Sequence, residues 1–357
     1  QRMKIAIIPG DGVGPELISE ITKVIDVINS HYKSQLDYEL FPFGAAHFIK
    51  YGENINQDFL NQLKNNFRGV LIGALGDPSL HSQAYVKDIL SSIIHSEDMI
   101  IVDKPLTLFS AELSKIKGLS SDPPFHMTLI RDSIEGLEVS GGYRIRSHSD
   151  KEIASDTQIY DQESVKKIVE YACKKAEAEK FKQIPLILRR PLFPNTHKLW
   201  EKCYLNIMQK NNLAGKILEV PAFLHQFISN PQSYPIILAP GFTGEILNEL
   251  VTEFIGGKLY SSSMFCSNEN KFLVIPDHGP QNAIAGSGQA LPFAALYSLA
   301  IIYKKLNMIS PSRIIIRAII KSFESKWLTS GHGGSMTTDT VGNFIAAYID
   351  KQLSVRV

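Results

Sequence analysis

A glycine-rich turn near the start of the chain has the residue types of a phosphate-binding loop. Gly10, Gly12 and Gly14 surround Asp11 in the segment GDGVGPE, between an apolar run and an amphipathic stretch. A dinucleotide-binding loop needs the spacing G-x-G-x-x-G, which brings the backbone close to a pyrophosphate. The glycines here alternate instead, so the spacing argues against a dinucleotide fingerprint. We interpret the segment as a turn that joins a strand to a helix.

The three cysteines give little support to a metal site or a disulfide. Cys173, Cys203 and Cys266 are far apart, odd in number and form no CxxC pair. Zinc sites and disulfide frameworks depend on close pairs or even sets. The cysteines therefore favour a reducing compartment. The N-terminus has no signal-peptide pattern, and we expect a cytoplasmic protein.

Short apolar runs alternate with helical stretches in the first third of the chain. Residues 4–9 read as a buried strand, and Leu17, Ile18, Ile21, Val24 and Ile25 then recur at helical spacing. Pro15 suits the first turn of that helix. Further buried strands are expected at 70–72 and 100–102. This alternation predicts an α/β fold with a mainly parallel sheet.

The middle of the chain has a different character from its two ends. Residues 140–147 are polar and turn-rich and could form a projecting arm. Other segments expected in the middle are strands at 126–130, 185–188 and 235–238, a charged helix at 163–180 and a helix starting near Gly244. Long helices at 290–304, 311–327 and 340–351 close the chain, with Ser310 as N-cap and Pro311 as first residue of the second.

Composition excludes some classes of protein. The 357 residues are enough for about two domains. Basic and acidic residues number 37 and 36, a formal net charge of +1, which argues against a nucleic-acid partner and against docking on anionic membranes. No apolar run reaches the ~18 residues that span a bilayer.

An ordered set of motifs resembles one family across nearly the whole chain. After GDGVGPEL come Gly44-Ala45-Ala46, Gly73-Ala74-Leu75-Gly76, Asn230-Pro231, Gly244-Glu245-Ile246-Leu247, His278-Gly279, Ile284-Ala285-Gly286 and Pro292. Their order and spacing resemble the β-decarboxylating dehydrogenases, which include the isocitrate and isopropylmalate enzymes. The resemblance implies a two-domain, non-Rossmann α/β fold, with residues 1–103 plus 257–357 forming a cofactor-side domain and residues 104–256 an inserted domain. It also implies a homodimer whose inserted domains complete each other's sites.

Both proton-transfer positions of the family are substituted. The family lysine, which takes the hydroxyl proton, corresponds by resemblance to Arg190. Arginine holds its proton up to a pKa above about 12, so Arg190 cannot be the base, although it could clamp an anion or simply lie at the surface. The family tyrosine corresponds to Glu138, and Tyr143 could replace it only if the loop were rearranged.

The metal position is also altered. One family aspartate corresponds to Pro221, which offers no ligand, and the i, i+4 pair corresponds to Glu245 and Glu249. Two carboxylates on one helix face could hold Mg²⁺ or Mn²⁺ weakly, or could be a solvated acidic face. His225 lies nearby in the sequence, and a structural role suits it better than ligation.

The substrate and cofactor positions are partly kept. By resemblance, the three carboxylate-binding arginines correspond to Ile94, Lys104 and Arg131. Ile94 has no charge, Lys104 keeps the charge but lacks the bidentate guanidinium, and Arg131 is retained. The adenosine-holding loop corresponds to His278, Gly279, Ala285 and Gly286. Its aspartate, its adenine-reading asparagine and the acidic residue that favours NAD correspond to Ala283, Leu291 and Gly331. The resemblance leaves open NAD, NADP or no cofactor, because turns alone also explain the glycines.

Two functions remain open. The joint substitutions favour a family-fold protein that has lost oxidative decarboxylation and acts by binding, as a homodimer with its own small carboxylate or nucleotide ligand or as a regulatory partner of a catalytic relative. The alternative is an active NAD(P)-dependent oxidoreductase that uses the cofactor loop, Arg131 and the two glutamates on an unusual 2-hydroxy acid.

Overall fold

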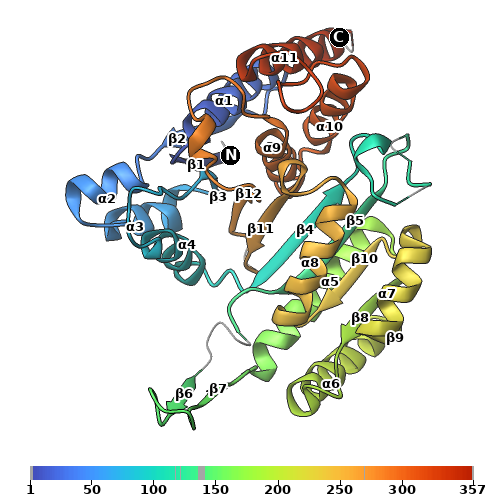
Figure 1. Cartoon of the computed structure of the whole chain (residues 1–357). Coiled ribbons are helices and arrows are strands. Elements are labelled where there is room, and N and C mark those ends of the chain that lie inside the picture. The colour runs from blue at the N-terminus through green and yellow to red at the C-terminus, as the bar shows by residue number, and fades with distance from the viewer. Residues whose placement is uncertain (1–2, 117, 121, 136–140, 269, 356–357) are drawn as a thin grey trace.

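The computed structural model describes residues 3–116, 118–120, 122–135, 141–268 and 270–355. One large sheet runs through the molecule, with helices packed around it (Figure 1). Within the described ranges, no helix has both the length and the apolar character needed to cross a membrane.

The main sheet has ten strands in the order β2-β1-β3-β12-β11-β4-β5-β10-β8-β9. Their bounds are β1 (Met3–Gly10), β2 (Leu36–Leu40), β3 (Gly69–Ala74), β4 (Ile101–Thr107), β5 (His126–Asp132), β8 (Gln183–Leu188), β9 (Ala214–Glu219), β10 (Ile236–Ala239), β11 (Ser262–Cys266) and β12 (Phe272–Pro276). The four strands at each end pair in parallel, whereas β11 and β4 run antiparallel to their neighbours. The predicted mainly parallel α/β sheet is thereby confirmed.

The helices cover the sheet and bring the two ends of the chain together. The helices are α1 (Gly14–His31), α2 (Ala45–Tyr51), α3 (Gln57–Asn66), α4 (Ala84–Ser96), α5 (Gln162–Glu179), α6 (Pro194–Lys210), α7 (Val220–Ser229), α8 (Gly241–Phe254), α9 (Phe293–Lys305), α10 (Ile309–Glu324) and α11 (Thr338–Ser354). The N-terminal α1 packs against the C-terminal α11, and α9 packs against α10 (Figure 1). The sheet passes through the predicted boundary within β4, so the division into 1–103 plus 257–357 and 104–256 remains a prediction.

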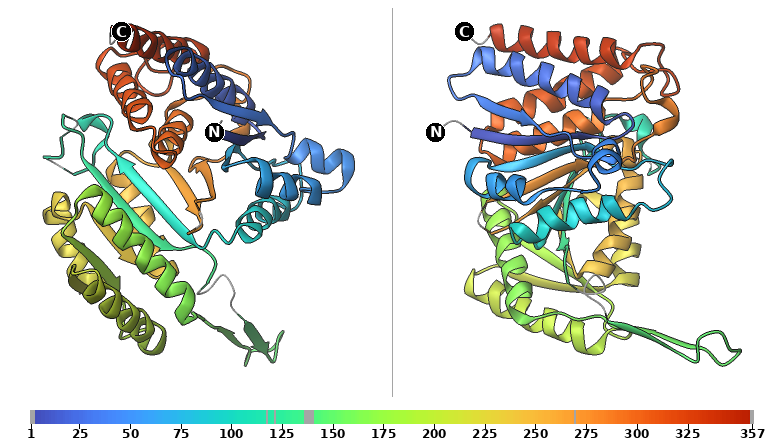
Figure 2. Two further views of the ribbon diagram at one scale, coloured as in Figure 1. Left: turned by 180° about the vertical axis from the view of Figure 1, so that it is seen from behind. Right: turned by 90° about the vertical axis from the view of Figure 1, so that its left-hand side faces the viewer.

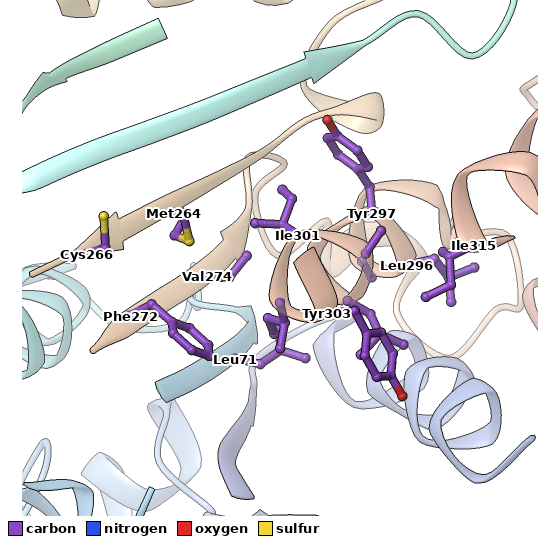
Figure 3. Packing of buried hydrophobic residues seen from close by; sticks show 14 of the residues in the cluster. Leu71, Met264, Cys266, Phe272, Val274, Leu296, Tyr297, Ile301, Tyr303 and Ile315 are labelled. Atoms are coloured by element: carbon purple, nitrogen blue, oxygen red, sulfur yellow. The ribbon is translucent and has the colours of Figure 1, made fainter. Parts of the chain in front are cut away.

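The core is built where α9 crosses the sheet. Every residue of α9 from Phe293 to Tyr303 is buried, because the helix is covered on all sides. Figure 3 shows Leu296, Tyr297 and Ile301 of this helix beside side chains of β3, β11 and β12. Burial of apolar area at roughly 25 cal/mol per Å² makes this the main source of stability.

A two-stranded hairpin projects from the body of the molecule. It consists of β6 (Gly142–Ile145) and β7 (Ile153–Asp156), which pair antiparallel (Figure 2). Its apolar side chains Tyr143, Ile145 and Ile153 are 57%, 47% and 49% exposed. The predicted arm within 140–147 matches this hairpin.

One predicted helix start is wrong. The helix α10 begins at Ile309, with Met308 at its N-cap and no side-chain capping bond, whereas Ser310 was expected to cap it. Ser310 lies inside the first turn, where its Oγ accepts a hydrogen bond from the Tyr32 hydroxyl (2.9 Å). The three cysteines are free and buried.

Candidate functional site

The turn between β1 and α1 is organised by Asp11, to which the sequence assigned no role. Its buried carboxylate accepts hydrogen bonds from the N–H of Ala45 (2.7 Å), the N–H of Gly76 (2.8 Å) and the hydroxyl of Tyr85 (2.7 Å). Burial and the neighbouring carboxylate raise the pKa of Tyr85. Asp11 therefore holds three segments together: the start of α2, the loop after β3, and α4.

The alternating glycines allow this turn to pack closely. Gly12 has φ +57°, and a Cβ there would lie 2.0 Å from the carbonyl oxygen of Pro280. A Cβ on Gly10, at φ +72°, would lie 1.8 Å from the carbonyl oxygen of Ala74. The Val13 N–H also donates to Pro280 (2.8 Å). The turn thus supports the 278–286 loop through backbone contact that only glycine permits.

The loop expected to hold a nucleotide has one unsatisfied polar atom. His278 is buried, its Nδ1 lies 2.9 Å from the Gly279 carbonyl, and its Nε2 has no partner among the described residues. Burial lowers the pKa of His278. A Cβ on Gly279 or Gly286 would meet nothing within 4 Å, so space is open beside the loop.

The fit to a nucleotide is incomplete elsewhere in this loop. Ala285 follows a short 3₁₀ turn (Asn282–Ile284), and the Gly286 N–H donates to Glu16 (3.3 Å), so one amide is already used. Leu291, at the position of the adenine-reading residue, is buried and apolar. The loop could hold the backbone of a nucleotide, but no side chain at these positions selects NAD or NADP.

A cavity of about 950 Å³, here called the front cavity, adjoins this loop. Its lining includes Gly76, Pro280 and Asn282, and the Asn282 amide donates to the Gly76 carbonyl (3.2 Å). Val86, Leu90 and Ile94 of α4, with Ile134 and Phe265, contribute apolar side chains to the lining, and α4 also contributes Lys87, Ser91 and His95. A lining of apolar side chains with several polar groups suits a small amphipathic ligand.

Arg131 is the basic residue of β5 that lines the front cavity. Its Nη1 donates to the Asp132 carbonyl (2.9 Å), and its Nη2 lies 3.7 Å from Glu245. Its buried Nε has no partner among the described residues. Arg131 and Glu245, both predicted as site residues, are therefore together at this cavity.

The two other substrate-binding positions contribute differently. Ile94 lines the front cavity with an apolar side chain. Lys104 is 2% exposed and is not among the residues that line this cavity, because its ammonium donates to Asp277 (2.5 Å). Burial lowers the pKa of Lys104, against the opposing effect of Asp277. Lys104 therefore belongs to an internal ion pair.

Arg190 is held by two carboxylates. It follows β8, and its Nε donates to Glu219 at the end of β9 (2.6 Å), while its Nη1 donates to Glu201 of α6 (3.0 Å). Its backbone N–H also donates to Glu219 (3.2 Å). The bond to Glu219 raises the pKa of Arg190 further above its usual range. Pro221 lies in the first turn of α7, two residues after Glu219, and has no polar side-chain atom.

The two predicted metal ligands are already paired with basic residues. Glu245 lies near Arg131, and Glu249 lies 3.0 Å from Lys258. Both side chains are more than half exposed. Among the described residues, no group of three or more His, Cys, Asp or Glu side chains is placed to hold a metal. The donor set of this chain does not fit a divalent ion held in the family's manner.

Glu138 lies outside the described residues. The preceding Glu135 is described, and its carboxyl accepts from the Asp161 N–H (3.2 Å) at the start of α5. Burial, and then hydrogen bonding with the Asp161 carboxyl, raise the pKa of Glu135 to about 8. The same hydrogen bond holds the pKa of Asp161 well below its usual range.

Comparison with known proteins agrees with this geometry. The family model described as isocitrate/isopropylmalate dehydrogenase matches residues 4–345. The chain belongs to the isocitrate/isopropylmalate dehydrogenase family. It is 26% identical over 350 residues to a 3-isopropylmalate dehydrogenase of Nocardia farcinica, covering 97% of this chain and 100% of the relative. A 3-isopropylmalate dehydrogenase of Thermobifida fusca is 24% identical over 353 residues, covering 98% of each chain.

Solved structures of the isocitrate/isopropylmalate dehydrogenase family share the fold. An isocitrate dehydrogenase from Methylococcus capsulatus superposes with a TM-score of 0.81 at 21% identity, covering 98% of this chain and 99% of that one. A β-decarboxylating dehydrogenase from Thermococcus kodakarensis gives a TM-score of 0.80 at 21% identity, covering 99% and 97%. The expected family and fold are both confirmed.

Three carboxylates were not predicted from the sequence of this isocitrate/isopropylmalate dehydrogenase relative. Glu201 and Glu219 lie 11 and 29 residues from Arg190. Asp277 lies 173 residues from Lys104. Asp277 could have been noticed because it directly precedes the His278-Gly279 motif. Glu219 could have been noticed because it lies two residues before Pro221, the position that corresponds to a family aspartate. No sequence signal points to Glu201.

Proposed function

We propose that this family member binds a small carboxylate or nucleotide in the front cavity and does not perform the metal-dependent oxidative decarboxylation typical of its family. The observation that carries this proposal is the state of Arg190. By resemblance it corresponds to the family's proton-accepting lysine, and both Glu219 and Glu201 bind it. A guanidinium with two carboxylate partners neither accepts a proton near neutrality nor is free to reach a substrate hydroxyl.

The metal position supports the same proposal. A Lewis-acid step needs a cation fixed against the substrate oxygen by several oxygen ligands. Pro221 provides none, and Glu245 and Glu249 are exposed and paired with basic residues. Weak binding of Mg²⁺ or Mn²⁺ at the two glutamates remains compatible with their exposure, but it would not orient a substrate.

Ligand binding is supported by Arg131. Its buried Nε is unpartnered within the described part of the chain, and it lines a cavity with apolar walls. A carboxylate in the cavity would pair with the Arg131 guanidinium, and a short apolar body would contact the apolar side chains of the lining. The protein then acts as a binding or regulatory protein.

A partner surface is supported by the β6–β7 hairpin. Its exposed Tyr143, Ile145 and Ile153 project beyond the body of the molecule (Figure 2). Exposed apolar side chains on a projecting hairpin suit association with a second copy or with a catalytic relative. Light scattering of wild type and of Ile145→Asp tests this association.

The alternative is an active NAD(P)-dependent oxidoreductase on an unusual 2-hydroxy acid. One observation favours it: the unpartnered Nε2 of His278 and the open space at Gly279 lie beside a cavity that contains Arg131. Restoring Arg190→Lys together with Glu138→Tyr would disturb such an activity, whereas a binding protein has none to lose.

Calorimetry separates these functions. NAD, NADP, isocitrate and 3-isopropylmalate are titrated into the protein with and without Mg²⁺ or Mn²⁺, and into the Arg131→Ala variant. Binding that needs no metal and is lost in Arg131→Ala supports the proposal. Absence of binding across the panel by folded protein contradicts it. Binding that needs the metal and leads to nicotinamide reduction supports the alternative.

A further inference from the structure

A second cavity, here called the back cavity, lies behind the sheet. It has a volume of about 720 Å³ and lies between α5 on one side and α9 and α10 on the other. Strand alternation places it opposite the front cavity, since Met264 lines the back cavity and its neighbour Phe265 lines the front. No described residue lines both cavities.

Two carboxylates at the floor of the back cavity are already neutralised. Asp103, 1% exposed, accepts hydrogen bonds from Lys175 (2.8 Å) and from the Tyr171 hydroxyl (2.6 Å). Glu179 accepts from Lys304 (2.8 Å) and lies 3.3 Å from Lys175. These four charged groups pair with one another, so both carboxylates in the described lining have a cationic partner, although Asp103 Oδ1 has no hydrogen-bond partner among the described residues.

Three further basic side chains line the back cavity without a carboxylate partner in the described residues. They are Lys180 at the end of α5, Lys305 at the end of α9 and Arg313 of α10. The Lys305 ammonium lies over the Tyr171 ring, 5.1 Å from its centroid, which holds it at the cavity wall. The described lining therefore has five basic and two acidic side chains, an excess of three positive charges.

The remaining titratable group at the floor does not offset this excess. His126 donates to or accepts from the Thr107 hydroxyl (3.0 Å). Burial, and then the nearby Lys304, lower the pKa of His126 to about 4. His126 is thus neutral at physiological pH, and its suppressed protonation is consistent with a positive potential in the cavity.

Apolar side chains cover the wall between these charges. Met264, Ile301 and Ile316 line the cavity together with the Tyr171 and Tyr297 rings. The volume falls within the range of roughly 300–1,000 Å³ that small-molecule sites occupy. Three uncompensated cations around an apolar wall match an anionic head joined to a short apolar body.

We propose that the back cavity binds a small organic dianion, a phosphate monoester or dicarboxylate with a short apolar body, whose charged head lies among Lys180, Lys305 and Arg313. Arg313 provides the fork that pairs with two anion oxygens, and the lysines add point charges. The body contacts the apolar wall. Because α5 and α9–α10 come from different parts of the chain, the ligand links the predicted inserted segment to the C-terminal helices.

The experiment uses phenyl phosphate, phthalate and inorganic phosphate as probes, titrated by calorimetry into the full chain at low salt. We expect phenyl phosphate or phthalate to bind at least about tenfold more tightly than inorganic phosphate, since only they contact the apolar wall. The tighter of the two identifies the head group. Arg313→Ala and Lys305→Ala each weaken binding by at least about fivefold, and Arg313→Lys weakens it less.

Two controls locate the site. Lys64→Ala removes one positive charge from α3, at the other end of the sheet, and leaves probe affinity unchanged. Because the front cavity is itself proposed to take small carboxylates, the titrations are repeated in Arg131→Ala, where binding at the back cavity persists. Bound probe also raises the melting temperature, by mass action on the folded state. The proposal is overturned if no probe binds, if Arg131→Ala abolishes binding, or if Lys64→Ala weakens it as much as Arg313→Ala. Arg313 and Lys180 are exposed, so their loss does not threaten folding.

Discussion

Asp11 and Arg190 are both charged groups that bind partners from distant segments, but their surroundings differ. Asp11 is buried, and its partners are two backbone amides and a tyrosine hydroxyl. Arg190 has a side chain that is 42% exposed, and its partners are two carboxylates. The first arrangement holds the loops of the family fold in place. The second pairs charges at a residue that, by resemblance, corresponds to the family's proton-accepting lysine.

The comparison distinguishes two kinds of charged group: Asp11 is buried within the fold, whereas Arg190 is paired at a partly exposed position. The close approaches at Gly10 and Gly12 and the Asp11 hydrogen bonds depend on the family's N-terminal turn, which the chain retains. The Arg190 pairing joins side chains that are each partly exposed. Changes near Asp11 should therefore affect stability strongly, and changes at Arg190 should affect it little.

The largest effect is expected from Asp11→Ala. The change leaves the amides of Ala45 and Gly76 and the Tyr85 hydroxyl without their acceptor, and each stranded buried donor costs about 1–3 kcal/mol. We expect the free energy of unfolding in urea to fall by about 3–5 kcal/mol. Asp77→Ala, at a half-buried position of the same region whose carboxylate accepts a hydrogen bond from the Ser79 N–H (2.8 Å), is the matched control and should lower stability much less than Asp11→Ala. A loss below about 1 kcal/mol would contradict a framework role for Asp11.

Lys104→Met tests whether Lys104 stabilises the fold, as Asp11 does, or binds a ligand. Asp277, 11% exposed, would keep only the Ser263 hydroxyl (2.6 Å) as a partner. Removing one member of a buried pair costs about 3 kcal/mol, and Lys104→Met with Asp277→Asn should recover part of that loss. Urea unfolding of the two variants measures both values. If Lys104→Met left stability intact but abolished ligand binding at the front cavity, Lys104 would be a site residue instead.

The raised pKa of Glu135 predicts that the stability of the fold depends on pH. Its pKa in the folded chain, about 8, lies above the ordinary value for glutamate, so the folded state holds a proton that the unfolded state releases. Its contribution is complete below the unfolded pKa and is lost as pH rises toward about 8. We expect the melting temperature to fall across this window and the fall to be smaller in Glu135→Gln. Equal slopes in the two proteins would show that Glu135 is not the titrating group.

The smallest stability effect is expected at Arg190. Exposed ion pairs contribute about 0–1 kcal/mol, so Arg190→Lys should lower the free energy of unfolding by less than about 1 kcal/mol. A lysine here keeps the charge but loses the fork that contacts Glu219 and Glu201 together. A double-mutant cycle that combines Arg190→Lys with Glu219→Gln measures the coupling energy between the two side chains. A coupling above about 2 kcal/mol would place Arg190 among the framework residues.

Much of the fold follows from local sequence patterns, but the edges of the sheet do not. Apolar runs such as Ile5–Ile8 predicted β1, because both faces of that strand are buried. The edge strand β9 was missed, since its first residues are exposed and it has no apolar run. Ser310 was taken as an N-cap because local propensity cannot show that the Tyr32 hydroxyl uses its side chain inside the first turn.

The candidate site was predictable in position but not in pairing. Motif order predicted Arg131, Glu245 and His278 as site residues, and in the structure Arg131 and Glu245 line one cavity beside the 278–286 loop. The partners of Arg190 and Lys104 come from other strands and helices, and no local spacing predicts a contact across 29 or 173 residues. The back cavity lies between helices whose charged residues look like ordinary surface in the sequence.

The most direct test of the proposed function is an assay of nicotinamide reduction. Purified protein is mixed with NAD or NADP, isocitrate or 3-isopropylmalate, and Mg²⁺ or Mn²⁺, in parallel with the Arg190→Ala variant. The closed pairing of Arg190 with Glu219 and Glu201 predicts no metal-dependent reduction above background in either protein. Turnover by the wild-type chain that disappears in Arg190→Ala would contradict the account, because Arg190 would then take part in the reaction.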